Sequence, residues 1–540
     1  MQRQAATEKG LTRRVQDLGL GQVPDPRQKR KVRHTLSSLL SALVAALVTK
    51  ARSLRVVEQR TKEISARHGE WLGIEGRIAD NTFGRLLSRV RVAALVACLH
   101  RLVKTEHRRG NLKPSVLRWG TIAIDGKNIA TLRWHDLCRV LGVGPQSASF
   151  DEVREVLRER FPEAQLCRPQ EGLPYALMRA HTVTLISAEA SMCIHLRPIE
   201  GHTNEVGSMP ELLEEVDAAY GRTGIFRVIT TDAGNTSLGS AGKTVRLGYH
   251  YFGQIKSPNG EIHEEAVAAL GEQRHGRAHA TDSDKQNGHT ATYYAWRYDL
   301  GDEGWLDWTH ARQIVRIRRD VTDNVTGKLL STGNRYYVTS LTADSLSAQE
   351  ALKLSRAHWR CENNTHWTAD AELGEDRVQH TWSKHPHGVL VVAALRMMAL
   401  AILAVARQLS RLGYTKEHPS WAQVATHFLL QLGAGSLETS AFDDVQVRPP
   451  WRRPAVSASR TPPPPPMGAG RAAPASSRRR PAGAPAARLG RRRGGQGSVL
   501  RGEGECWLLE AQEREVPRAT LQEHPGAVLQ EGELADGAGA

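Results

Sequence analysis

The sequence has few cysteines, a low aromatic content of 5% and no long apolar segment free of charge. Its six cysteines include no C-x-x-C pair, which argues against a disulfide framework and a zinc ribbon and favours a reducing cytosol. Residues 1–16 are polar, so they do not supply the apolar region of a secretory signal. The apolar run 36–48 is too short to cross a bilayer, and the run 388–406 carries Arg396 in its middle. Both runs are therefore predicted to be core helices.

Acidic residues are missing from one long stretch near the end of the chain, and this changes the meaning of its charge. The formal charge is +16, a value that suits binding to nucleic-acid phosphates. Twelve Arg and no acid lie in residues 448–497, and residues 1–34 hold +6. Only +4 remains on residues 35–447. Because a run of like charge is usually a solvated segment, the net charge is weak support for nucleic-acid binding.

The length and the changes in composition predict several domains. At roughly 150 residues per domain, the chain is long enough for three or four. We expect an α/β fold: a mixed sheet with flanking helices, preceded by a small helical domain and followed by a tail. The expected parts are a flexible N-terminus (1–24), a helical domain (25–112), a catalytic domain in two pieces (113–259 and 341–440) with a helical insertion (133–180), a β-rich insertion (260–340) and a disordered tail (441–540).

The two flanks of this arrangement have alternative interpretations. The helical domain either binds DNA or is only a packed helical unit, since both give the same apolar stripe. From about residue 448 the Pro-, Arg- and Gly-rich sequence cannot bury enough apolar area to offset its ordering entropy, which predicts disorder. Translation beyond the true end of the gene is a second explanation for the abrupt change in composition.

Three acids occupy related places in the predicted elements. Asp125 ends a buried apolar run that begins at residue 119, and Asp232 ends a second one that begins at residue 226. Glu362 lies on a helix that precedes the apolar helix 388–406. Carboxylates at the ends of neighbouring strands converge, and a helix across the sheet edge can supply a third. Such hard oxygen ligands suit Mg²⁺ or Mn²⁺, and two such ions promote in-line phosphoryl displacement.

Each acid also has a simpler interpretation. Asp125-Gly126 can be only a turn, and Asp232 can cap the helix that follows it. Glu362 alone can be a solvated charge on a helix. A further alternative is zinc, because His358, Glu362 and His366 have the i, i+4, i+8 spacing of one helix face. Both histidines precede a tryptophan, so packing and DNA-facing roles compete with metal binding.

Four motifs resemble one family. AIDGKNI, HTNEVGSMPELL, VITTDAGNTS and RAHWRCENNTHWTADAELGEDRV are similar to segments of the DDE transposases of bacterial insertion sequences, in the branch that includes the H-repeat-associated proteins. The resemblance covers roughly residues 25–410. It implies an RNase H-like core and a catalytic, metal-binding triad made of Asp125, Asp232 and Glu362. His358 and Ala369 depart from the family pattern, since arginine and lysine are common in these places.

The resemblance also implies a function. It predicts a transposase that uses two Mg²⁺ or Mn²⁺ ions to cleave DNA at terminal inverted repeats and to join the freed 3′-OH to target DNA. The expected partners are DNA and a second copy of the chain, a homodimer in a paired-end complex, and the expected location is the bacterial cytoplasm at the nucleoid. Two alternatives remain open: an inactive or domesticated DNA-binding relic, and a metal-dependent DNA nuclease.

Several further side chains are candidates for contacts with DNA. The basic candidates, each of which can also be a solvated charge, are Lys127, Lys256, Arg316, Arg318, Arg319, Arg356 and His358. Three tryptophans of the β-rich insertion can stack on an unpaired base or can form the core of the insertion: Trp296, Trp305 and Trp308.

Overall fold

The computed structural model describes most of the chain up to residue 433. The residues outside the described part are Met1, 258–259, 272–276, 287, 302–307, 309, 376–381, 410–418 and 434–540. The predicted tail and Trp305 therefore lie outside the described residues.

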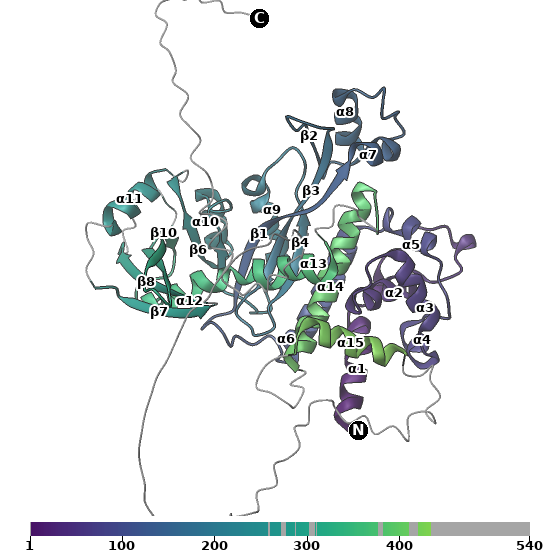
Figure 1. The fold of residues 1–540 in the computed structure, drawn as a ribbon, viewed down its shortest axis with the longest axis horizontal. Coiled ribbons are helices and arrows are strands. Elements are labelled where there is room, and N and C mark those ends of the chain that lie inside the picture. Colours follow the sequence, from purple (N-terminus) through teal and green to yellow (C-terminus); the bar gives the residue numbers. More distant parts are fainter. Residues whose placement is uncertain are drawn as a thin grey trace, which may run out of the picture. The chain divides into compact units, whose positions relative to one another are not determined.

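The N-terminal segment is helical (Figure 1), and small hydroxyl side chains cap several of its helices. The hydroxyls of Thr35, Ser53 and Ser65 each accept a backbone N–H from the first turn of the following helix, which satisfies a donor that the helix itself cannot pair. The helices and 3-10 turns are α1 (Gln2–Asp17), η1 (Leu20–Gln22), η2 (Lys29–Lys31), α2 (Leu36–Val48), α3 (Leu54–Glu63), α4 (Ala66–Leu72), α5 (Asp80–Leu87) and α6 (Val92–Arg108).

The start of the chain differs from the prediction of a flexible segment over 1–24. Leu11, Val15 and Leu18 follow helical spacing, and each is at most 2% exposed because this face of α1 packs into the core. The polar face of α1 is also fixed, since Arg109 of the α6 C-cap pairs with Asp17 at 2.6 Å. Most residues of this segment are polar, so its apolar face was not recognised from the sequence.

One mixed sheet of ten strands organises the described part of the chain beyond α6 (Figure 1). Its main order is β2-β3-β1-β5-β6-β10-β9-β8-β7, and β4 also pairs with β3. β1, β5 and β6 are parallel neighbours, whereas β3 and β4 pair in antiparallel fashion. The strands are β1 (Thr121–Arg133), β2 (Ala164–Cys167), β3 (Tyr175–Leu185), β4 (Met192–Pro198), β5 (Val228–Thr231), β6 (His250–Ile255), β7 (Ala280–Gln286), β8 (His289–Asp299), β9 (Gln313–Asp323) and β10 (Leu329–Thr339). The predicted α/β class with a mixed sheet is confirmed.

Helices connect and cover the strands. α9 and α10 form the crossovers that allow β1, β5 and β6 to run parallel, and α12 to α14 follow the last strand. The strands of the predicted β-rich insertion continue the same sheet, because β10 pairs with β6. The remaining helices are α7 (Trp134–Leu141), α8 (Phe150–Arg160), α9 (Glu205–Tyr220), α10 (Leu238–Arg246), α11 (Glu261–Leu270), α12 (Ala348–His358), the π-helical turn η5 (Glu362–His366), α13 (Trp367–Leu373), α14 (Pro386–Leu409) and α15 (Trp421–Gly433).

Helix α14 lies in the centre of the core. By length and composition it could cross a membrane, but its apolar span is buried inside the protein, where it packs against α2, α6 and β4. Arg396 in its middle is only 3% exposed and faces the Glu375 carboxylate at 3.4 Å. The charge is therefore compensated within the protein, as a buried charge requires. The runs 36–48 and 388–406 are both core helices, as predicted.

Candidate active site

Asp125 and Asp232 are neighbours on adjacent parallel strands. The β1–β5 pairing ends at Ile124 opposite Thr231, and each acid is the next residue in its chain segment. The sequence placed Asp125 at the end of a strand, but β1 continues to Arg133. The parallel partner β5 ends beside Asp125, so Asp125 and Asp232 occupy neighbouring backbone positions at the end of the β1–β5 pairing. The turn interpretation of Asp125 is therefore wrong.

Asp232 is held by the loop that follows β5. The Asn235 backbone N–H and side-chain amide both donate to Asp232 Oδ1, at 3.0 and 2.7 Å. Helix α10 begins later and is capped by Ser237, so Asp232 does not cap it. The loop fixes one carboxylate oxygen of Asp232 and thereby orients the side chain.

Glu362 starts a π-helical turn inside an otherwise α-helical segment. The Trp367 N–H donates to the Glu362 carbonyl, which is the wider i to i+5 bond of a π-helix. π-Helical turns are rare in proteins, but those that occur are often found at functional sites, because the wider turn changes the direction of its side chains. The turn carries Glu362 over the sheet close enough to act electrostatically on Asp125.

The neighbouring acids affect the protonation of Asp125. Burial raises the pKa of Asp125 well above its ordinary value, and the charges of Asp232, Glu362 and Glu205 raise it further, opposed by the Gly126 N–H. Burial also raises the pKa of the Cys361 thiol, and the charges of Asp125, Glu362 and Asp232 raise it further. The structure thus brings the three predicted acids into one electrostatic group and adds a fourth acid to it.

That fourth acid, Glu205, was missed by the sequence analysis. It is the first residue of α9, which Asn204 caps. A Cβ atom at position 126 would lie 2.1 Å from Glu205 Oε1, so the carboxylate rests against the backbone where Gly126 leaves space. Burial and the charge of Asp232 raise the pKa of Glu205. The signal in the sequence was a glycine inside a strand, which often marks a close approach by another group.

The two histidines of the zinc alternative are engaged with the sheet. His358 Nδ1 lies 2.9 Å from the hydroxyl of Thr230 on β5, and His366 Nε2 lies 2.6 Å from that of Thr182 on β3. Burial lowers the pKa of His358 to about 4 and that of His366 to about 3, so both rings are neutral at pH 7. The two contacts hold the segment that carries Glu362 against β5 and β3, the strands on either side of β1.

Lys127 does not reach solvent. Its ammonium lies 2.8 Å from Asp370 and 3.4 Å from Glu375, and it donates to the carbonyl oxygen of His366 at 3.2 Å. Glu375 in turn faces Arg396 on α14. Lys127 therefore belongs to a buried charge network that fixes α13 against β1, and the predicted contact with a DNA phosphate does not fit its position.

Most of the other DNA-contact candidates are also buried. Arg316 is 1% exposed, donates to Asn334 and to the Leu270 carbonyl, and lies over the Trp296 ring. Four candidates lie within the protein interior and form part of the packing of the insertion: Arg316, Arg319, Trp296 and Trp308. For the two described tryptophans, the structure favours the core interpretation.

Three candidates retain some exposure. Lys256 is exposed just after β6. Arg318 pairs with Asp320 at 2.7 Å, and Arg356 of α12 pairs with Asp282 and Asp284 of β7 at 2.5 and 3.2 Å. Arg356 thus joins α12, the helix before Glu362, to strand β7.

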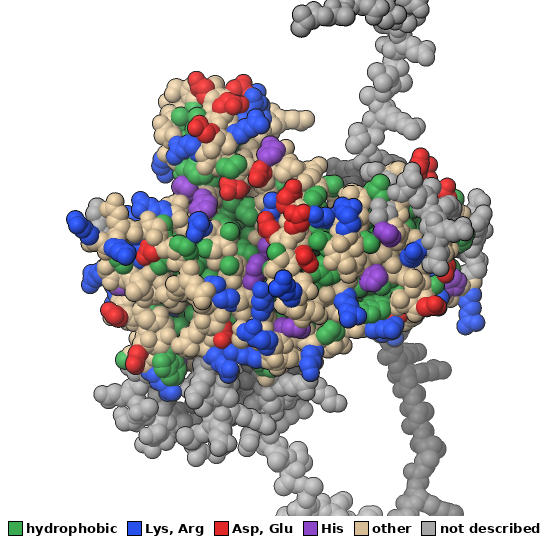
Figure 2. All heavy atoms as spheres, turned by 180° about the vertical axis from the view of Figure 1, so that it is seen from behind, with side chains coloured by type: hydrophobic (Ala, Val, Ile, Leu, Met, Phe, Trp, Pro, Cys, Tyr) green, Lys and Arg blue, Asp and Glu red, His purple; other side chains and the backbone are tan. Residues whose placement is uncertain are grey.

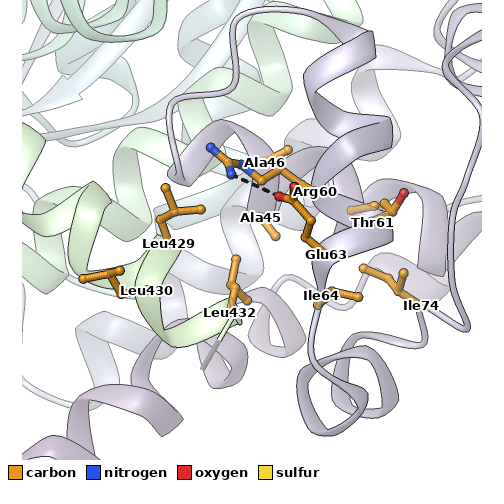
Figure 3. A pocket seen from close by; sticks show the side chains of 12 residues that line it. Ala45, Ala46, Arg60, Thr61, Glu63, Ile64, Ile74, Leu429, Leu430 and Leu432 are labelled. Atoms are coloured by element: carbon orange, nitrogen blue, oxygen red, sulfur yellow. Dashed lines mark ion pairs between the residues drawn. The ribbon is translucent and has the colours of Figure 1, made fainter. Parts of the chain in front are cut away.

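The surface carries both signs of charge. On the face shown in Figure 2, acidic side chains gather near the middle, and Lys and Arg side chains are spread below and beside them. An apolar cavity of about 320 Å³ lies elsewhere, between α2, α3 and α15 (Figure 3). Its lining includes Ala45, Ile64 and Leu432 and none of the predicted acids. The candidate site is therefore the acidic group at the sheet and not this cavity.

Comparisons with known proteins agree with the motifs. The DDE_Tnp_1-associated family matches residues 19–103. YbfL and YhhI of Escherichia coli (strain K12) are each 24% identical over 370 residues, which span 66% of this chain and 82% of each relative. YncI of Escherichia coli O157:H7 is 22% identical over 396 residues, 71% of this chain and 85% of the relative. YhhI is named as an H repeat-associated transposase and YncI as a transposase.

The family match and the named relatives support a likeness of the chain to the DDE transposases of bacterial insertion sequences. The predicted resemblance is thereby confirmed. A solved piggyBac transposase synaptic complex with hairpin DNA covers 82% of this chain, and the match spans 83% of that structure's chain, at 12% identity. Its TM-score of 0.37 is too low to support any inference.

Proposed function

We propose that this chain cleaves DNA at the ends of its element and joins the freed 3′-OH ends to target DNA, with Asp125, Asp232 and Glu362 as its catalytic acids. The observation that carries the proposal is the meeting of these acids, two from adjacent strand positions and one from a π-helical turn. The likeness of the chain to DDE transposases supports the same chemistry.

The proposed core is RNase H-like. Three antiparallel strands, β1, β3 and β4, are followed through helical crossovers by β5 and β6, which run parallel to β1. The strand order β4-β3-β1-β5-β6 supports this assignment, and β7 to β10 extend the sheet beyond it. We also propose that the helical segment over 25–112, most of which the DDE_Tnp_1-associated match covers, is a DNA-binding domain.

The acids suit hard divalent cations. Among the described residues, no three His, Cys, Asp or Glu side chains are already arranged to hold a metal ion. The donor set nevertheless fits Mg²⁺ or Mn²⁺, because neighbouring acids raise the pKa of Asp125 and of Glu205, and added positive charge would stabilise their ionised forms. Asp125, Asp232 and Glu362 would hold the ions. Two such ions, when bound, activate the attacking oxygen and stabilise the leaving oxygen.

The remaining side chains position these acids. Asn235 orients Asp232, while the Thr230–His358 and Thr182–His366 contacts fix the helix segment that carries Glu362 above the strands. The proposed partners are the terminal inverted repeats, target DNA and a second copy of the chain in a paired-end complex. The proposed location is the bacterial cytoplasm at the nucleoid.

The test is an assay with the full chain, DNA that contains the element ends, a target plasmid and Mg²⁺. Joined products that disappear in Asp125→Asn and Glu362→Gln support the proposal. Cleavage without joining would indicate a nuclease, and DNA binding alone would indicate an inactive relic. Full cleavage activity in either variant would overturn the assignment of the acids.

A further inference from the structure

We propose that His366 is a positioning residue for Asp125, which it orients through its Nδ1–H while Thr182 fixes the tautomer of its ring. This inference rests on the proposed function, because it concerns how one of the proposed acids is held.

The register of the sheet places Thr182 beside the catalytic acid. Thr182 of β3 is the antiparallel partner of Asp125 of β1, so the two side chains emerge on the same face. His366 lies above both: its Nε2 is 2.6 Å from the Thr182 hydroxyl, and its Nδ1 is 3.5 Å from Asp125 Oδ2. The imidazole is 9% exposed, so protein groups rather than solvent set its orientation.

The distances select a direction for the hydrogen bonds. The Thr182 hydroxyl carries one proton and has two acceptors nearby, His366 Nε2 at 2.6 Å and the Asp125 carbonyl oxygen at 3.4 Å. The other ring nitrogen, Nδ1, lies 3.5 Å from the Asp125 carboxylate, which can only accept, so the ring proton is favoured on Nδ1 and Thr182 donates to Nε2. A neutral imidazole then carries its single proton on Nδ1, the nitrogen that faces the Asp125 carboxylate. The resulting order is hydroxyl, imidazole, carboxylate.

The backbone of His366 is fixed as well. Lys127, two residues after Asp125 on β1, donates to the His366 carbonyl oxygen at 3.2 Å. The next residue towards the N-terminus, Thr365, contacts the Thr184 hydroxyl at 3.3 Å. The π-helical turn therefore meets β1 and β3 at several points, and His366 is held at a defined height over Asp125. Groups that orient a cation-binding carboxylate in this way typically change cation affinity when they are removed.

Two substitutions separate the two ring nitrogens. In His366→Asn the side-chain amide lies near the position of Nδ1, whereas in His366→Gln it lies near the position of Nε2. Asn therefore keeps a donor for Asp125 and loses the Thr182 contact, and Gln does the reverse. A purely structural role predicts that both variants lose stability and function together.

The experiment measures Mn²⁺ binding by electron paramagnetic resonance, Mn²⁺-dependent DNA cleavage and thermal unfolding in the full chain. We expect His366→Gln to weaken Mn²⁺ binding roughly 10- to 100-fold, and His366→Asn to retain most of the affinity. Thr182→Val, which keeps the β-branched shape and removes the hydroxyl, should weaken binding less than His366→Gln. His195→Gln is the control for loss of a buried imidazole that contacts Glu215 instead of the three proposed acids, and it should leave Mn²⁺ binding unchanged.

The outcomes separate this inference from the function. Equal Mn²⁺ affinity in wild type, His366→Gln and Thr182→Val would overturn the positioning role, and so would equal losses in His366→Asn and His366→Gln. If Asp125→Asn abolishes cleavage in the same series, the proposed function survives that result. If Asp125→Asn cleaves normally, the proposed function itself fails.

Discussion

The Glu205 carboxylate fills the space that a side chain at Gly126 would need: a Cβ atom at position 126 would lie 2.1 Å from Glu205 Oε1. This relationship places a fourth carboxylate near Asp125 and Asp232: Glu205 helps to raise the pKa of Asp125, and Asp232 helps to raise that of Glu205. It also explains why a glycine lies inside strand β1, since any side chain at this position would displace the carboxylate.

Gly126→Ala should therefore act on the site more than on the fold. The atoms nearest to the new Cβ belong to the flexible end of Glu205, so the carboxylate can move away, and we expect the free energy of unfolding to change by less than about 1 kcal/mol. DNA cleavage should fall about 10-fold if the Glu205 carboxylate supports the site. Gly126→Ala combined with Glu205→Ala should cleave no worse than Glu205→Ala, because both remove the same interaction. Gly333→Ala in β10, where a Cβ meets open space, is the matched control and should cleave normally.

Arg396→Met should destabilise the protein strongly. Arg396 and Glu375 are 3% and 0% exposed, so the substitution removes a charge that compensates a buried carboxylate. We expect a loss of about 3–5 kcal/mol in the free energy of unfolding, measured by denaturant titration. Lys384→Met breaks an ion pair in which the lysine is 60% exposed and should cost less than about 1 kcal/mol. Similar values for the two variants would contradict the buried network.

His100 predicts a loss of stability in mild acid. Its Nε2 lies 2.9 Å from His195 Nδ1, and burial together with the neighbouring His195 and Lys104 charges lowers its pKa to about 3. The unfolded chain, with a pKa near 6.5, binds the proton more tightly, so stability present above pH 6.5 is lost as the pH falls towards 3.

His100→Gln should remove part of this pH dependence. The contribution is at most about 1.4 kcal/mol per pH unit in this window, reduced by solvent screening. Thermal unfolding between pH 7 and pH 4 should show a shallower slope for the variant than for wild type. His202→Gln, at a side chain that is 59% exposed, should leave the slope unchanged. Parallel curves for wild type and His100→Gln would refute the role of this pair.

Arg316 and Lys256 should behave differently towards DNA. Arg316 is internal and bonded to Asn334 and Leu270, so Arg316→Met should lower the free energy of unfolding by about 1–3 kcal/mol and leave the salt dependence of DNA binding unchanged. If Lys256 meets a phosphate, Lys256→Ala should reduce the slope of log K against log salt by about one. A reduced slope for Arg316→Met would show that Arg316 reaches DNA after all.

The sequence by itself predicted the mixed α/β class, the core helices at 36–48 and 388–406, and the resemblance to DDE transposases. These depend on local signals: apolar runs of defined length, the break between β-branched and helical segments, and motifs of fixed order. The motifs also identified Asp125, Asp232 and Glu362 as candidate catalytic acids. The pattern of apolar residues placed each of them next to a predicted buried strand or helix.

Only the tertiary structure decided which polar groups lie together. Lys127 and Arg316 are basic residues of the kind that contact DNA, yet both are internal. Their partners, such as Asp370 and Asn334, come from other strands and helices. Glu205 joins the acids, and His366 reaches Asp125, through sheet register, crossover packing and a π-helical turn. Local propensity determines where helices and strands form. Pairing between distant segments determines which side chains come together, and this pairing cannot be predicted from any short stretch of sequence.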